Sequence, residues 1–272
     1  MKVNDPEKKR HFDEKTRKYE EKIRAYLKNE VTVLEECQND PDNAALKLWA
    51  LSNDMLNLAS NYLAINGVCR MVFEQRDETA LGEARKAVSK AIVYIENIVT
   101  GKIDVPFSDY EENLAELSSI SPAAKYDFTR KIGCCVALLK LGYGDNTKWH
   151  WSFVDIEGRY TAVAKNLLDL RKAFGNNDPS APDYEPLLYH LNLVKSLVEQ
   201  QAHKFQERYS IATKRPDDIR LAMNFLSTLR QFHLMLNDTG EAEETKKKYD
   251  SWKQAYENEK RKSRETKKIA AG

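Results

Sequence analysis

The sequence predicts an all-α protein, built of antiparallel helical hairpins in an elongated bundle or a loosely repeat-like array of about eight or nine helices. Apolar residues recur at intervals of three and four from Phe12 to Tyr256, while Gly and Pro stand mainly between these periodic stretches. No stretch shows the alternation typical of a strand. Charged residues make up 31% of the chain and the mean hydropathy is −0.66, so an elongated body with much solvated helix surface is expected.

Two long helices are predicted at the start of the chain. Asp5-Pro6 has the residue types of a helix N-cap and first turn, and the first helix is highly charged before its apolar positions become frequent. Asn39 to Asp42 ends it. The next helix, from Leu46 to Ile65, is the most apolar of the first half and is expected to be central. Asn66-Gly67 either ends this helix or only weakens it.

Three further helices are predicted before residue 147. Asp77 to Val99 follows the helical period, and Thr100-Gly101 closes it with a residue suited to a left-handed conformation. Ser108 has the capping-box spacing to Glu111 and so starts a short helix to Leu117. Ser121-Pro122 caps the next helix, whose predicted apolar stripe includes Cys135, Leu138 and Leu141.

The second half of the chain is predicted to hold longer helices. Thr147 to Phe174 forms one helix with an aromatic start, and residues 175–183 are the least helical segment. Leu187 to Ala212 has apolar steps close to those of a coiled-coil seam. Pro216 to Tyr256 then forms a helical hairpin around an Asn-Asp-Thr-Gly turn.

These breaks divide the chain into three predicted parts: an N-terminal helical subdomain (1–174), a C-terminal helical hairpin region (175–259) and a basic flexible tail (260–272). The hairpin Pro216 to Tyr256 resembles tetratricopeptide-type units in size and punctuation, although it lacks that family's Trp, Leu-Gly and terminal Pro pattern and has no second copy. The predicted number of helices is similar to that of 14-3-3 proteins, but their phosphate-binding Arg and Tyr motifs are not found in this sequence.

The sequence contains no motif for metal or phosphate chemistry. No His has a Glu three residues before it, and neither HExxH nor a Cys/His cluster at ligand spacing occurs. Gly142 to Lys148 lacks the third Gly of a dinucleotide loop and the ending of a P-loop, so an ordinary turn is favoured. Glu199 and His203 share a helix face, as a hydrogen-bonded pair would. We therefore predict no catalytic set, no metal and no cofactor.

Cysteine usage and hydropathy indicate a cytoplasmic protein without a membrane span. Cys37, Cys69, Cys134 and Cys135 lie in apolar-periodic stretches and form no CxxC, which favours free thiols in a reducing compartment. For the adjacent pair, a buried structural role is favoured over a redox role. The charged N-terminus, Met1 to Arg10, is not followed by an apolar signal region, and no later run reaches about 18 apolar residues.

The densest aromatic feature lies at the predicted helix start Lys148 to Phe153. Successive helical residues point about 100° apart, so Trp149 and Trp151 cannot both lie in one narrow core stripe. A hydrophobic staple between two helices is the simplest interpretation. Because aromatic residues dominate interface hot spots, Trp149, Trp151 and Phe153 are also candidate partner contacts. Ligand stacking is a third interpretation.

The C-terminal segment carries six positive charges and one negative charge between residues 260 and 268. It is interpreted as a solvated tail that can add electrostatic attraction to an acidic partner. Nucleic-acid binding is disfavoured because no aromatic residue interleaves with these cations, and because 43 basic residues balance 42 acidic ones over the chain. The basic residues are Lys260, Arg261, Lys262, Arg264, Lys267 and Lys268.

We therefore expect a non-catalytic scaffold, adaptor or structural component of a larger assembly, with other proteins as its partners. The alternatives are an enzyme whose active site is assembled from distant helices, and a ligand-dependent helical regulator. A deep pocket holding several carboxylates or histidines would favour the enzyme, whereas an exposed aromatic groove with a polar rim would favour a partner site.

Overall fold

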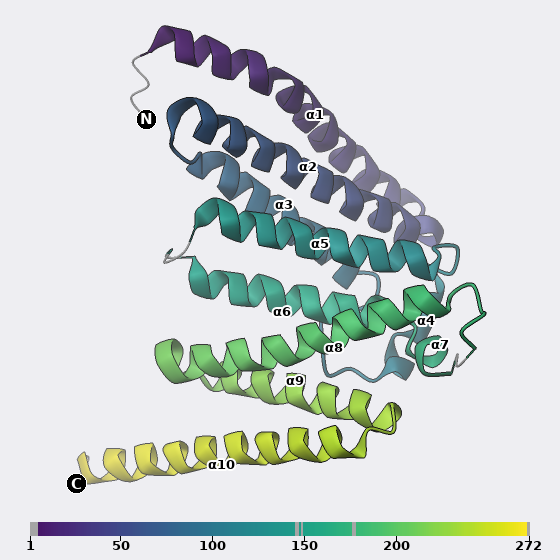
Figure 1. Ribbon diagram of the computed structural model, residues 1–272, viewed down its shortest axis with the longest axis vertical. Coiled ribbons are helices and arrows are strands. Elements are labelled where there is room, and N and C mark those ends of the chain that lie inside the picture. The colour runs from purple at the N-terminus through teal and green to yellow at the C-terminus, as the bar shows by residue number, and fades with distance from the viewer. Residues whose placement is uncertain (1–4, 145–146, 148, 176–177, 271–272) are drawn as a thin grey trace. The chain divides into compact units, whose positions relative to one another are not determined.

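The computed structural model confirms the all-α class (Figure 1). It describes residues 5–144, 147, 149–175 and 178–270, with the side chains of residues 42, 263, 264 and 266–270 excepted. Within these residues the chain forms ten α-helices and no strand. Two of them, α4 and α7, have only five and six residues, so the other eight agree with the predicted number.

The helices belong to two compact units. Unit 1 comprises Met1–Lys102 and Phe107–Asp169, and unit 2 comprises Ile103–Pro106 and Leu170–Gly272. The predicted helix from Thr147 to Phe174 is interrupted where Leu168 adopts an extended conformation. The longer segment of unit 2 begins at Leu170, directly after this interruption. The sequence had predicted the subdomain boundary at Gly175, five residues later.

Unit 1 is built around α2, which packs against α1, α3 and α5. Leu51, Met55, Leu56 and Cys69 are each at most 1% exposed, which agrees with the predicted central position of this helix. The helices of unit 1 are α1 (Pro6–Asn39), α2 (Ala44–Phe73), α3 (Glu78–Glu96), α4 (Glu111–Ala115), α5 (Pro122–Tyr143) and α6 (His150–Leu167), with 3-10 turns at Pro41–Asn43 and Phe107–Asp109.

Two predicted N-caps in unit 1 are confirmed. The Asp5 side chain accepts hydrogen bonds from the backbone N–H groups of Glu7 and Lys8 at 3.0 and 3.2 Å. Ser121 accepts one from Ala124 at 3.2 Å. Each side chain satisfies donors that the first helical turn leaves without a backbone partner.

The structure settles one helix end in unit 1 that the sequence left open and corrects two other predicted helix boundaries. Helix α2 continues through Asn66-Gly67 to Phe73, and the buried Asn66 side chain accepts a hydrogen bond from the Asp77 backbone N–H (2.8 Å), which fixes the turn after the helix. The positive φ after α3 belongs to Thr100 (136°), not to Gly101. Ser108 lies within a 3-10 turn and donates to the Asp109 carboxylate at 3.0 Å, and the short helix α4 begins only at Glu111.

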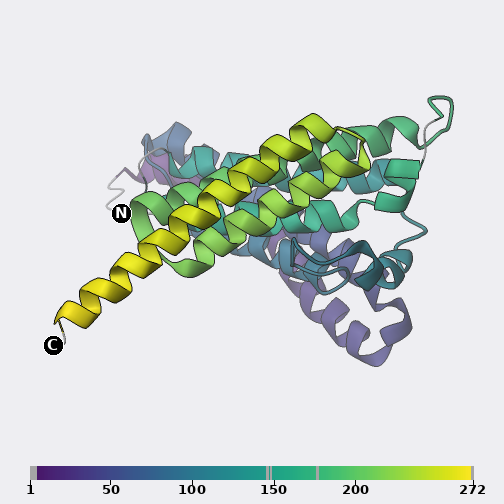
Figure 2. The ribbon, with the colours of Figure 1, turned by 90° about the horizontal axis from the view of Figure 1, so that it is seen from below.

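Unit 2 is a layer of three long helices in which α9 contacts both α8 and α10. Phe225 and Phe232 of α9 are 2% and 1% exposed, and the ring of Phe205 on α8 stacks on Phe225 at 5.6 Å. Figure 2 shows α9 and α10 side by side. The elements of unit 2 are residues 103–106, α7 (Leu170–Gly175), α8 (Tyr184–Glu207), a π-helical turn (Arg208–Thr213), α9 (Pro216–Met235) and α10 (Thr239–Ala270).

Two features of unit 2 differ from the predicted elements. The helix expected from Leu187 to Ala212 changes to π geometry at Arg208, where Arg208 and Asp218 form a buried ion pair and Thr213 donates to the same carboxylate. Helix α10 continues through Ala270, so residues 260–270 have a helical backbone where fraying was expected. Cationic residues near a helix C-terminus interact favourably with its dipole, which gives a physical reason for this continuation.

Candidate functional site

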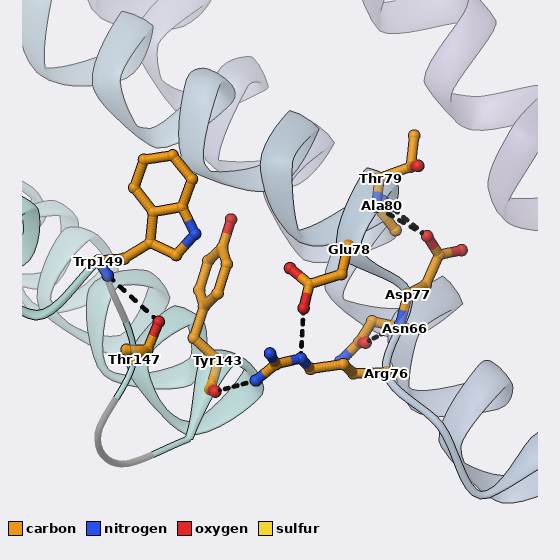
Figure 3. A network of polar contacts seen from close by, with 9 residues as sticks. All are labelled: Asn66, Arg76, Asp77, Glu78, Thr79, Ala80, Tyr143, Thr147 and Trp149. Carbon is orange, nitrogen blue, oxygen red and sulfur yellow. Dashed lines mark hydrogen bonds and ion pairs between the residues drawn. The ribbon is translucent and has the colours of Figure 1, made fainter. Parts of the chain in front are cut away.

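The aromatic start of α6 packs against α5 and α3. The Trp149 ring lies 6.2 Å from that of Tyr143 and 4.3 Å from the guanidinium of Arg85. The Phe153 ring lies 5.6 Å from Tyr143, and Phe153 is only 2% exposed. Figure 3 shows Trp149 beside the Tyr143 ring. These side chains are what a hydrophobic staple between helices requires.

A polar network fixes Tyr143 from the other side (Figure 3). Arg76 donates to the backbone oxygen of Tyr143 at 2.5 Å and pairs with Glu78 at 2.5 Å. Asp77 caps α3 by accepting from the N–H groups of Thr79 and Ala80, both at 3.0 Å. Burial raises the pKa of Tyr143, so its hydroxyl is protonated at neutral pH. The network joins the α2–α3 turn to the end of α5.

The three aromatic residues proposed as partner contacts are therefore not equivalent. Phe153 contacts this chain's own core and offers no surface, because its side chain faces inward from the first turn of α6. Trp149 and Trp151 are partly exposed. Trp151 packs edge-to-face on His150, with 4.7 Å between the ring centres. A partner contact through Trp149 and Trp151 stays a prediction.

The basic residues near the C-terminus lie on an exposed part of α10. Lys260, Arg261 and Lys262 are exposed, whereas the side chains of Arg264, Lys267 and Lys268 lie outside the described residues. The Lys260 ammonium lies 5.9 Å from the ring centre of Tyr256, one turn before it. An aromatic ring therefore does accompany the first of these cations.

A surface that the sequence did not predict lies along α2 and α5. We name it the α2/α5 face and define it by Ser60, Ala64, Gly67 and Met71 of α2 and Cys134, Leu138 and Leu141 of α5. Met71 is 70% exposed, Leu141 is 69% exposed and Leu138 is 45% exposed. Ser60, Gly67 and Cys134 are also exposed, and Ala64 is partly so. Figure 1 shows α2 and α5 side by side.

Helix α5 has two apolar stripes, which is why sequence reasoning misplaced Leu138 and Leu141 in the core. Ile132, Val136 and Leu139 are buried. Cys134, Leu138 and Leu141, at spacings of four and three, form a second stripe on the other side of the helix. An apolar residue in a helix is usually assigned to the buried side. The one signal in the sequence is that the apolar residues of α5 together cover more of the helix circumference than a single buried side needs.

The polar end of the α2/α5 face is marked by Lys131. Its ammonium donates to the side-chain oxygens of Asn53 and Asn57, each at 2.7 Å. Burial lowers the pKa of Lys131, although it also lies near Asp54 and Cys135, which act in the opposite direction. One turn further, the Ser60 hydroxyl and the Cys135 sulfur are 3.9 Å apart. These contacts fix the two helices alongside each other.

Unit 2 contains a groove between α8 and α10 with α9 as its floor. Its volume is about 540 Å³, within the range of ligand sites. His233 on the floor is 7% exposed, and its Nδ1 lies 3.6 Å from Oδ2 of Asp238. The lining residues are Asn192, Lys195, Ser196 and Glu199 of α8, Leu229 and His233 of α9, and Asp238, Glu241, Glu244, Thr245 and Lys248 at and along α10.

The two hydroxyl groups of this groove are engaged within their own helices. Thr245 donates to the backbone oxygen of Glu241 at 2.8 Å, and Ser196 accepts from the Gln200 side chain at 2.9 Å. An activated nucleophile would require a hydroxyl hydrogen-bonded to the imidazole of His233, and these bonds direct both hydroxyls elsewhere. The arrangement suits ligand binding better than nucleophilic catalysis.

The remaining predicted sites are placed as follows. Among the described residues, no three His, Cys, Asp or Glu side chains gather as a metal-ligand group. His203 lies 3.3 Å from the Lys248 ammonium and packs edge-to-face on Trp252 of α10. Cys134 is exposed and Cys135 is buried, and burial raises the pKa of the Cys135 thiol, which disfavours the reactive thiolate.

None of the helices in the described part of the chain has the length and apolar character needed to cross a lipid bilayer.

Comparison with known proteins gives one match. No curated protein sequence and no solved structure matches the chain significantly. The model of the TP0443 family matches residues 8–260, which cover both units. The chain therefore belongs to the TP0443 family.

Proposed function

We propose that this chain is a non-catalytic protein-interaction scaffold or adaptor, and that the α2/α5 face binds an amphipathic helix of a partner protein. The observation that supports the proposal most strongly is the second apolar stripe of α5. Leu138 and Leu141 expose 45% and 69% of their surface on a helix whose opposite side already supplies the core. Exposed apolar residues that share one side of a helix mark interaction sites more often than isolated exposed residues do.

The residue sizes on the two helices suit a helical partner. Ser60, Ala64 and Gly67 of α2 are small, and a side chain added at Gly67 would meet open space within 4 Å. A partner helix can therefore approach α2 closely while its own apolar residues pack on Leu138 and Leu141. Fully burying an exposed Leu side chain contributes about 1.5–3 kcal/mol, and the exposed parts of Leu138 and Leu141 together amount to about one such side chain, so this stripe supplies a minor part of a micromolar affinity of about 8 kcal/mol.

The polar end of the face gives the partner an orientation. Lys131 is partly buried, and the hydrogen bonds of its ammonium group go to two neutral amide oxygens. An acidic residue at one end of the partner helix would pair with this charge. Such pairs contribute more to specificity and orientation than to affinity.

The proposal is tested by placing charge on the stripe. A partner is first captured from native cell extract with the tagged full-length chain and is then purified. Its affinity for the wild-type chain and for Leu138→Glu/Leu141→Glu is measured by isothermal titration calorimetry. We expect the double variant to weaken binding at least about 30-fold, which corresponds to about 2 kcal/mol.

Leu234→Glu is the matched control, because Leu234 on α9 is also 45% exposed and lies in the other unit. It should leave the affinity unchanged. Far-ultraviolet circular dichroism shows whether each variant keeps its helices. Equal affinity of the folded double variant and the wild type would show that the α2/α5 face is not the binding surface.

A further inference from the structure

The groove between α8 and α10 carries a second, independent inference. We propose that it binds a short aliphatic polyamine, a ligand with two or three protonated amines joined by methylene chains. This goes beyond the proposed protein interaction, which concerns unit 1 alone.

The charge of the groove favours a cationic ligand. Four carboxylates line it (Glu199, Asp238, Glu241 and Glu244), against two lysines. Lys195 stands on the α8 wall within one turn of Glu199, where it can offset that carboxylate. The α10 wall therefore carries its uncompensated negative charge at Asp238 and Glu241, because Glu244 is paired with Lys247 at 2.7 Å.

The spacing on the α10 wall suits amines separated by three or four carbons. Asp238, Glu241 and Glu244 follow one another at intervals of three residues, which is about 4.5 Å along the helix axis per step. Amines joined by three or four methylene groups lie roughly 5–6 Å apart when extended, from ordinary bond lengths. Two amines can thus meet Asp238 and Glu241, and a third amine would replace Lys247 at Glu244, while Leu229 on the floor offers apolar surface to the methylene chain.

His233 provides the observation that separates this groove from an ordinary acidic helix surface. It is more than nine-tenths buried, and its Nδ1 has no hydrogen-bond partner within the described part of the chain. A buried polar atom without a partner costs about 1–3 kcal/mol. The nearest carboxylate oxygen, Oδ2 of Asp238, lies 3.6 Å away, too far for a hydrogen bond.

One ammonium group can satisfy both atoms. A nitrogen placed about 2.9 Å from Nδ1 and from Oδ2 would donate one hydrogen bond to each. Asp238 is held for this role because its other oxygen, Oδ1, accepts from the Glu241 backbone N–H at 3.3 Å as the cap of α10. Nδ1 is shielded from water, so an ammonium group reaches it only after a change in the side-chain rotamer of His233.

The opposite end of the groove limits the length of the ligand. Lys248 lies there, 3.3 Å from His203, whose ring packs on Trp252. Burial and the neighbouring Lys248 lower the pKa of His203, so the imidazole is neutral and Lys248 carries the positive charge. This charge repels a further amine, which favours a diamine or triamine over a longer polyamine.

The test uses spermidine and the full chain. Isothermal titration calorimetry at low ionic strength measures the affinity for the wild type, for Glu241→Gln/Glu244→Gln and for His233→Leu. We expect the double variant to weaken spermidine binding at least about tenfold and His233→Leu to weaken it several-fold. Thermal unfolding without ligand shows whether His233→Leu is folded, and the double variant changes exposed residues only.

Glu243→Gln is the matched control, because Glu243 is exposed on α10 outside the groove and pairs with Lys246 at 4.0 Å. It removes the same charge and should leave the affinity unchanged. Equal weakening by Glu243→Gln, or displacement of spermidine by an equivalent charge of Mg²⁺, would show general counter-ion attraction and overturn the proposal. Absence of saturable spermidine binding to the wild type would overturn it as well.

Discussion

Helix α1 depends on one buried carboxylate, and removing its hydrogen bonds should loosen this helix. Only Thr16, Ile23 and Glu30 are buried on α1. Glu30 is 6% exposed and accepts a 2.5 Å hydrogen bond from the Tyr94 hydroxyl of α3. The Lys90 ammonium lies 2.8 Å from each of its oxygens. The two α3 residues should contribute unequally, because Tyr94 is buried and the Lys90 side chain is 49% exposed.

The expected magnitudes follow from this difference in burial. Tyr94→Phe removes a hydrogen bond to a charged group in a dry environment, which should lower the free energy of unfolding by about 1.5–3 kcal/mol. Lys90→Met removes a solvent-screened ion pair and should cost less than about 1 kcal/mol. Glu30→Ala should cost about 3 kcal/mol, because it also leaves the buried Tyr94 hydroxyl without an acceptor.

The assay is urea unfolding followed by circular dichroism, combined with a double-mutant cycle. Tyr94→Phe and Glu30→Ala should show a coupling of about 2 kcal/mol, and the amides of α1 should exchange faster in either variant. Arg17→Ala is the control, since the Arg17–Glu21 pair on the same helix is exposed and should contribute less than about 0.5 kcal/mol. A Tyr94–Glu30 coupling smaller than the Lys90–Glu30 coupling would refute the reasoning from burial.

Three further predictions concern binding and pH. Trp151→Ala should weaken the binding of a captured partner by about 2 kcal/mol or more at every salt concentration, if the variant stays folded. Unchanged affinity would show that Trp151 serves only in packing. Deletion of residues 260–272 should weaken binding mainly at low salt, because exposed charges are screened over about 8 Å at physiological salt, and affinities at two salt concentrations measure this. Burial raises the pKa of Tyr110 and Tyr160, so the unfolded chain loses these protons first, and stability should fall above about pH 10 by about 1.4 kcal/mol per pH unit for each tyrosine. Urea unfolding of Tyr160→Phe at pH 9 to 11 should show a smaller slope, and an unchanged slope would contradict this assignment.

Local signals in the sequence predicted the helices well and some of their ends poorly. Asp5 and Ser121 cap their helices as expected, because a cap needs only residues within one turn. The end of α3 was assigned to the wrong residue. Thr100 adopts its positive φ where the Asn166 side chain donates to the backbone oxygens of Thr100 and Lys102, at 2.8 and 3.1 Å. No local pattern shows a partner that distant.

The candidate surfaces were harder to predict than the fold for a similar reason. The exposure of Leu138 depends on which neighbours cover α5, and helical periodicity assigns such a residue to a stripe without saying whether that stripe is covered. The groove brings together Glu199 of α8 and Glu244 of α10, which are 45 residues apart in the sequence, with the whole of α9 between them. His233 and Asp238 are five residues apart, but their spacing across a turn matches no known motif.

The discontinuity of unit 2 has a consequence for the order in which the protein can form during synthesis. Ile103–Pro106 belong to the same unit as Leu170–Gly272, and the Thr228 hydroxyl donates to the Ile103 backbone oxygen at 3.3 Å across 125 residues. At a translation rate of about 5–20 residues per second, Ile103 leaves the ribosome roughly 6–25 s before its partner. A fragment that begins at Leu170 would lack this segment altogether. A gene designed to express unit 2 alone should therefore carry residues 103–106 fused to the fragment, and the native chain must keep this short segment accessible until the last hairpin has been made.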